Sequence, residues 1–103
     1  MIAHNVFFTL KDQTEANTEK LIAACKTYLA DHPGVVFFAA GGLAKECDRP
    51  VNVCDWDVAL HVIFDTMANQ DLYQVAPMHL QFIAENRELW ASVKVFDSVV
   101  EGN

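Results

Sequence analysis

The order of secondary-structure signals along the chain constrains its fold more than any other feature. Four segments rich in Val, Ile, Phe and Thr have the character of strands: residues 3–10, 35–40, 56–64 and 92–100. Helical patterns follow the first and the third of these segments. The predicted order is therefore β-α-β-β-α-β, which is typical of a ferredoxin-like α+β fold. Such a fold has a four-stranded antiparallel sheet with its helices on one face.

The first helical region has boundary signals at both ends. Thr14 can cap its start, and residues 32–34, His-Pro-Gly, end it. Apolar positions at helical spacing lie between these limits: Leu21, Ile22, Cys25, Tyr28 and Leu29. The spacing predicts an amphipathic helix that packs on the sheet.

A proline interrupts the second helical region. Asp65 or Thr66 can cap a short helix that extends through Val75. Pro77 then begins a longer helix, because the missing N–H of proline is not needed in a first turn. We expect this second helix to reach about Trp90, before the last strand.

Both faces of the predicted sheet are apolar. In the third strand Val58, Leu60, Val62 and Phe64 oppose Asp57, Ala59, His61 and Ile63, and in the second strand Val35, Phe37 and Ala39 oppose Val36, Phe38 and Ala40. A sheet with one face in water should instead alternate apolar and polar residues. The face away from the helices therefore needs a cover, and we expect a homodimer that packs sheet on sheet, with His61 at the interface.

Charge and composition exclude several classes of protein. Seven basic and fourteen acidic side chains among 103 residues give a net charge of −7, which disfavours nucleic acid and anionic membranes as partners. No apolar run approaches the roughly eighteen residues of a membrane-spanning helix. The N-terminus lacks the basic region of a signal peptide. We expect a single domain over residues 1–103, located in the cytoplasm.

The cysteines fit that compartment. Cys25, Cys47 and Cys54 are odd in number and have no C-x-x-C spacing, which favours free thiols. A disulfide between Cys47 and Cys54 is the less favoured alternative.

His79 is the candidate functional residue with the clearest context. It follows Pro77, and apolar or amide side chains recur after it at helical spacing: Phe82, Ile83, Asn86 and Trp90. A histidine on such a face is either a hydrogen-bonded core residue or an acid/base group that lines a cavity.

Four segments resemble the stress-responsive α/β-barrel (Dabb) domain family: residues 4–11, 56–64, 73–79 and 89–97. The resemblance covers nearly the whole chain and implies a dimeric α+β barrel. One similar plant enzyme cyclises a linear polyketide by intramolecular aldol condensation, with a histidine and a tyrosine in a cavity between sheet and helices. The resemblance places His79 and Tyr73 at those two positions and His4 at another histidine of the same cavity. The chain departs from the pattern at Ala76, where the family commonly has histidine, and at Val58, where the plant enzyme has one.

This resemblance implies a site with a chemical logic. His79 would act as a base near neutral pH, Tyr73 would donate a hydrogen bond to a developing oxyanion, and His4 would converge with them. The expected apolar walls are Phe82, Ile83, Trp90 and Val58. No cofactor is expected. His4 and His79 could supply two metal ligands, but no pair of carboxylates at suitable spacing completes a set.

Simpler roles remain open for the same residues. His79 could hydrogen-bond a neighbouring strand with His4 as its partner, and Tyr73 could be an ordinary boundary residue with a solvated hydroxyl. His32, which precedes a proline in a turn, should be exposed. The polar loop at residues 43–55 could cover a cavity mouth, where Arg49 would contact an anion.

The sequence is therefore compatible with three functions. The first is a domain that binds a small, mostly apolar molecule. The second is a lyase-like or cyclase-like enzyme with His79 as base and Tyr73 as partner. The third is a structural or stress-associated interaction protein without a ligand.

Overall fold

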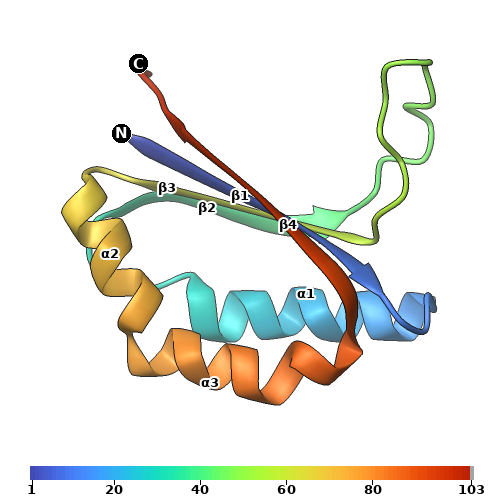
Figure 1. Ribbon diagram of the computed structural model, residues 1–103, viewed down its shortest axis with the longest axis horizontal. Coiled ribbons are helices and arrows are strands. Elements are labelled where there is room, and N and C mark those ends of the chain that lie inside the picture. The colour runs from blue at the N-terminus through green and yellow to red at the C-terminus, as the bar shows by residue number, and fades with distance from the viewer. Residues whose placement is uncertain (103) are drawn as a thin grey trace.

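Four antiparallel strands form one sheet whose spatial order is β2-β3-β1-β4. The computed structural model describes residues 1–102, and its strands are β1 (Ile2–Leu10), β2 (Val35–Gly42), β3 (Val58–Phe64) and β4 (Trp90–Val99). The helices α1 (Glu15–Leu29), α2 (Met67–Val75) and α3 (Pro77–Asn86) all lie on one face of this sheet, and a short 3₁₀ helix, η1 (Arg87–Leu89), leads into β4 (Figure 1). The ferredoxin-like α+β prediction is confirmed.

The core lies between the sheet and α1. Alternate residues of β1 and β3 point toward the helices and are buried: Val6, Phe8, Leu10, Val58, Leu60, Val62 and Phe64. They pack against Leu21, Cys25 and Leu29 on the buried side of α1. Burial raises the pKa of the Cys25 thiol to about 12. Cys25 therefore behaves as a small apolar residue of the core rather than as a nucleophile.

Threonine side chains begin two of the helices, as the sequence predicts. The Thr14 hydroxyl accepts a hydrogen bond from the backbone N–H of Asn17, and the Thr66 hydroxyl accepts one from Asn69, each at 3.2 Å. Thr66 rather than Asp65 is thus the cap of α2. Each cap satisfies an amide that would otherwise lack a partner in the first turn.

The second strand departs from its predicted alternation. Its register with β3 shifts between Val35 and Phe37, so Val35 faces the core together with Phe38 and Ala40. The prediction that Val35 shares a face with Phe37 was wrong. An irregularity of this kind adds a residue to one strand and inverts the faces of all residues on one side of it.

The end of α3 also differs from the prediction. The helix stops at Asn86, whose side-chain amide donates to the Phe82 carbonyl at 2.9 Å. Trp90 is the first residue of β4 and pairs with Leu10 of β1 instead of continuing the helix. The third strand likewise begins at Val58, two residues later than predicted.

The sheet face away from the helices is open. Phe37 and Phe96 project from it with 52% and 59% of their surface exposed. The loop at residues 43–57 rises on this open side (Figure 1) and lines hollows there together with Phe7. The suggestion that this loop covers a cavity between sheet and helices was wrong, because the helices lie on the other side. Among residues 1–102, no helix is long and apolar enough to cross a membrane.

Candidate functional site

A cavity of about 190 Å³ lies between the sheet and the pair of helices α2 and α3. Its lining residues come from three strands, β1, β3 and β4, and from all three helices: His4, Val6, Phe8, Leu29, Leu60, Tyr73, Gln74, His79, Phe82, Ile83, Trp90, Val93 and Val95. Six of the seven residues that the sequence singled out are among them. The seventh, Val58, is not.

Val58 was wrongly assigned to the cavity wall. It is fully buried and pairs with Phe8 in the part of the sheet covered by the core. Leu60, two residues along the same face of β3, contributes the wall instead. Alternation fixes which face a residue occupies but not how far along the strand a cavity lies.

Tyr73 is buried at the centre of the site. Only 2% of its surface is exposed, and its ring lies 4.5 Å from the ring of His79 and 5.9 Å from that of His4. Its hydroxyl has no hydrogen-bond partner within residues 1–102. Burial, and to a smaller extent the Cys25 thiol, raise the pKa of this hydroxyl, so it stays protonated and can donate. The alternative of a solvated boundary tyrosine does not hold.

His79 is oriented by the break between α2 and α3. Its Nδ1 lies 3.1 Å from the Gln74 carbonyl oxygen, which belongs to the last turn of α2. Carbonyls of a last turn have no partner within their helix, and a carbonyl can only accept. Nδ1 therefore carries the proton, and in the neutral ring Nε2 keeps a free lone pair.

The environment keeps the His79 ring neutral. Burial lowers its pKa, the Gln74 carbonyl partly opposes this effect, and the nearby His4 and His32 lower it further. A half-buried imidazole with a lowered pKa is unprotonated at neutral pH and can take up a proton. His79 contacts helix α2 rather than a strand, so the proposed pairing with His4 does not occur.

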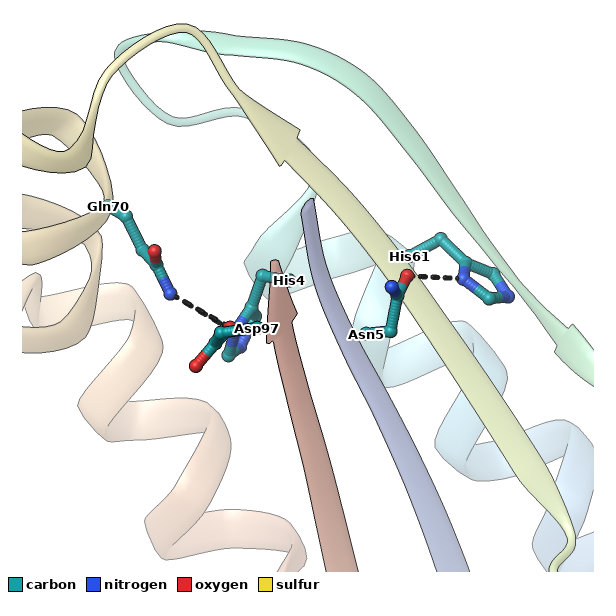
Figure 2. Close-up of polar contacts among 5 residues, drawn as sticks. All are labelled: His4, Asn5, His61, Gln70 and Asp97. Atoms are coloured by element: carbon teal, nitrogen blue, oxygen red, sulfur yellow. Dashed lines mark hydrogen bonds and ion pairs between the residues drawn. The ribbon is translucent and has the colours of Figure 1, made fainter. Parts of the chain in front are cut away.

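His4 pairs instead with Asp97 of β4, the register partner of His4 across the sheet. The His4 Nδ1 lies 2.6 Å from the Asp97 Oδ1, and the Gln70 amide nitrogen donates to the same oxygen at 3.2 Å (Figure 2). The carboxylate fixes the proton on Nδ1 and leaves Nε2 as an acceptor. Sequence reasoning missed this role of Asp97. The available signal was an acidic residue on the inward face of a strand that otherwise carries Val93 and Val95 there.

Two further buried polar atoms have no partner within residues 1–102. They are the indole nitrogen of Trp90 and the side-chain oxygen of Gln70. Trp90 lines the cavity beside Phe82, with ring centroids 5.9 Å apart. The Tyr73 hydroxyl and the Trp90 indole nitrogen are thus two unpaired buried donors on residues that line the cavity. Burying a polar group without a partner is costly, so these donors call for a partner such as a ligand or an ordered water.

The other two histidines lie outside the cavity. His32 is half-buried rather than exposed: its Nε2 donates to the Tyr28 carbonyl at 2.7 Å, and its ring packs on Tyr73 at 5.0 Å. The prediction of an exposed His32 was wrong. His61 lies on the open face, where its Nδ1 donates to Asn5 at 2.7 Å (Figure 2).

The described residues place neither a lysine or arginine nor a metal-binding cluster at this cavity. The Arg49 side chain hydrogen-bonds Asn52 within its own loop, away from the cavity. No lining residue is a lysine or an arginine. Within residues 1–102, no three His, Cys, Asp or Glu side chains gather in a position to hold a metal ion.

The fold and this cavity define a small α+β domain of the ferredoxin-like class with a histidine–tyrosine site between sheet and helices. The chain belongs to the stress-responsive A/B barrel (Dabb) domain family, whose model matches residues 2–100. A search of curated proteins gave no match.

Solved structures resemble the chain over almost its full length. A Dabb family protein with a ferredoxin-like fold from Mesorhizobium loti is 22% identical, with a TM-score of 0.80 over 98% of this chain and 97% of that one. A dimeric ferredoxin-like protein of unknown function from Thermobifida fusca is also 22% identical, with a TM-score of 0.77 over 96% and 90%. The hydroxynitrile lyase from Passiflora edulis is 18% identical, with a TM-score of 0.75 over 99% and 94%. At these identities the likeness establishes the fold.

The unpaired hydroxyl of Tyr73 leads to a first prediction. Tyr73→Phe should raise the free energy of unfolding by about 1 kcal/mol, because a buried polar group without a partner costs about 1–3 kcal/mol. Urea unfolding followed by circular dichroism measures this change. Tyr28→Phe is the matched control, since the Tyr28 hydroxyl bonds Glu85 at the surface and its loss should not stabilise the chain. A clear loss of stability in Tyr73→Phe would mean that the hydroxyl has a partner in the folded protein.

Proposed function

We propose that the cavity binds a small, mostly apolar molecule that carries a hydrogen-bond acceptor such as a carbonyl oxygen. The observation that carries this proposal is the Tyr73 hydroxyl, which is buried, protonated and unpaired beside the cavity. A ligand oxygen would give it the partner that residues 1–102 do not provide. The Trp90 indole N–H offers a second donor of the same kind.

The size and polarity of the cavity narrow the class of ligand. Its volume of about 190 Å³ is below the roughly 300–1,000 Å³ of pockets for drug-sized molecules, which favours a compact ligand. Aromatic and aliphatic side chains such as Phe82, Ile83 and Val95 form most of the wall. With no cationic side chain in the lining, a carboxylate or phosphate would be poorly matched.

Acetophenone is a suitable probe, because α-methylstyrene has nearly the same shape but lacks the carbonyl oxygen. The chain has two tryptophans, Trp90 in the cavity and Trp56 on the open face, so Trp56→Phe leaves one that reports on the cavity. In that background, acetophenone should change the Trp90 fluorescence. Adding Tyr73→Phe should weaken acetophenone binding by about 5- to 10-fold, the equivalent of one hydrogen bond of about 1 kcal/mol.

The hydrocarbon probe supplies the control for this binding prediction. Its affinity should be unchanged by Tyr73→Phe, because it makes no hydrogen bond to the lost hydroxyl. If Tyr73→Phe weakened the binding of both probes equally, the variant would be altering the shape of the cavity. Failure of either probe to reach Trp90 would favour the structural or interaction role over a ligand-binding one.

A second candidate function is proton abstraction next to a carbonyl group, as in a lyase or a cyclase. The observation that favours it is the pairing of a neutral His79 base with a protonated Tyr73 donor whose rings lie 4.5 Å apart. The base would take the proton from the carbon, and the hydroxyl would stabilise the negative oxygen that forms. The structural likeness to a hydroxynitrile lyase supports a small-molecule enzyme on this fold without naming its substrate.

Deuterium exchange into the methyl group of acetophenone tests this chemistry, with proton NMR in D₂O as the measurement. The chain should accelerate exchange, His79→Gln should abolish the acceleration, and Tyr73→Phe should reduce it about 100-fold, as for the loss of one oxyanion donor. Because burial lowers the pKa of His79, the neutral base persists below the ordinary histidine range. The rate should therefore be level near neutral pH and fall only as the pH drops through this lowered value.

The matched control is His61→Gln on the open face, which should leave exchange unchanged. A melting temperature near that of the wild-type chain shows that His79→Gln is folded. Exchange that survives His79→Gln in the folded chain would contradict a role for this imidazole as the base.

We also propose that the chain is a homodimer through its open sheet face. The exposed Phe37 and Phe96 and a hollow of about 400 Å³ lined by Phe7 and Trp56 give this face an apolar character. The similar protein from Thermobifida fusca is described as dimeric. A second copy would remove these side chains from water.

Light scattering tests this assembly. The wild-type chain should have twice the mass of one chain, and Phe96→Asp should reduce the mass to that of a monomer by placing an unpaired charge in the apolar face. Leu72→Asp, at an equally exposed position of α2, should leave the dimer intact. A wild-type monomer at micromolar concentration would contradict the proposal.

A further inference from the structure

We propose that Cys47 and Cys54 form a reversible dithiol–disulfide pair in the loop that joins β2 and β3. This pair lies on the open side of the sheet, away from the ligand cavity. The proposal is therefore independent of the proposed ligand site.

A tight turn brings the two cysteines together. The Asn52 amide donates to the Arg49 carbonyl at 2.9 Å, and the Arg49 amide donates to the Asn52 side-chain oxygen at 3.1 Å. Such reciprocal bonds reverse the chain direction, so residues on the two sides of the turn oppose each other as in a hairpin. Cys47 and Cys54 stand at matching positions, each two residues outside the turn.

The Cys54 sulfur approaches the backbone of Cys47. The Cys54 thiol lies 3.6 Å from the Cys47 carbonyl oxygen. The Cys47 sulfur is itself only three bonds from that carbonyl carbon, and rotation about χ1 moves it between staggered positions. Closure to the S–S distance of about 2.05 Å then requires rotation of the Cys47 side chain and an adjustment of the exposed loop.

Accessibility separates this pair from the third cysteine. Cys47 and Cys54 are exposed, whereas Cys25 is fully buried with a pKa raised to about 12. An oxidant in solution can reach the first two and not the third. The oxidant therefore reacts selectively with Cys47 and Cys54, because Cys25 is buried.

Glutathione disulfide is a sufficient oxidant for the reaction. One thiolate attacks it, forms a mixed disulfide and releases one glutathione. The second cysteine then attacks the protein sulfur of that mixed disulfide and releases the second glutathione. The two cysteines lose two hydrogens and form one S–S bond, and the glutathione disulfide is reduced to two thiols.

Closure of this bond would change the open face rather than the cavity. Both cysteines line a hollow of about 220 Å³ together with Phe7, Trp56 and His61. A disulfide would fix one wall of this hollow, because it would restrict the conformations that the loop can adopt.

Glutathione buffers and mass spectrometry test the pair in the full chain. Trypsin yields residues 21–26, which contain Cys25, and residues 46–87, which contain the pair, because the bond from Arg49 to Pro50 resists cleavage. After equilibration and alkylation, the larger peptide should be lighter by two hydrogens and should carry no alkyl group. The smaller peptide should be fully alkylated after unfolding.

The contribution of the fold to disulfide formation is measured by comparison with the same chain in denaturant. The effective concentration of the two thiols should be at least about tenfold higher in the folded chain than in the unfolded one. Asn52→Ala, which removes the side-chain acceptor in the turn, should lower it, and Asn17→Ala in α1 should not. Glutathione attached separately to each cysteine, disulfides between chains, or equal values in folded and unfolded chains would overturn the proposal.

Discussion

The site depends on the interruption of the second helical region at Ala76 and Pro77. Ala76 has an extended backbone, with φ −64° and ψ 139°, and the proline that follows has no N–H to continue the helix. The interruption frees the carbonyls of the last turn of α2, and the His79 imidazole satisfies one of them at Gln74. One backbone break thus places Tyr73 at the end of one helix against His79 at the start of the next and selects the tautomer of the imidazole.

The burial around this break determines the chemistry that is available. Tyr73 remains a donor because burial raises its pKa, while His79 remains an acceptor because burial lowers its own. His4 lines the same cavity from the sheet, and its partner Asp97 lies partly exposed on the edge strand β4. The result is a mostly apolar space with no lysine or arginine in its lining and with hydrogen-bonding groups of both kinds.

Much of the fold follows from local signals, such as helix caps, that can be recognised in the sequence. The caps at Thr14 and Thr66 and the restart at Pro77 are short-range features, and the structure has each of them. The irregularity in β2 was not predictable, because every residue from 35 to 40 is apolar and either alternation fits. Trp90 was misassigned since it continues a helical spacing, although pairing with Leu10 places it in a strand.

The candidate site shows the same limit. Its histidines and Tyr73 could be singled out from the sequence, but their partners come from distant segments. Asp97 meets His4 only through the register of β1 and β4, and no local pattern encodes that register. Leu60 and Val58 lie on the same strand face, so only the packing of helices above them decides which one lines the cavity.

We propose the buried Tyr73 hydroxyl as the anchor of a ligand-binding site. The most direct measurement is a crystal structure of the chain soaked with acetophenone. We expect the carbonyl oxygen to lie within about 3 Å of the Tyr73 hydroxyl, in the cavity between the sheet and α3. A probe found only in the hollow beside Phe7 and Trp56, with the Tyr73 hydroxyl still unpaired, would contradict it.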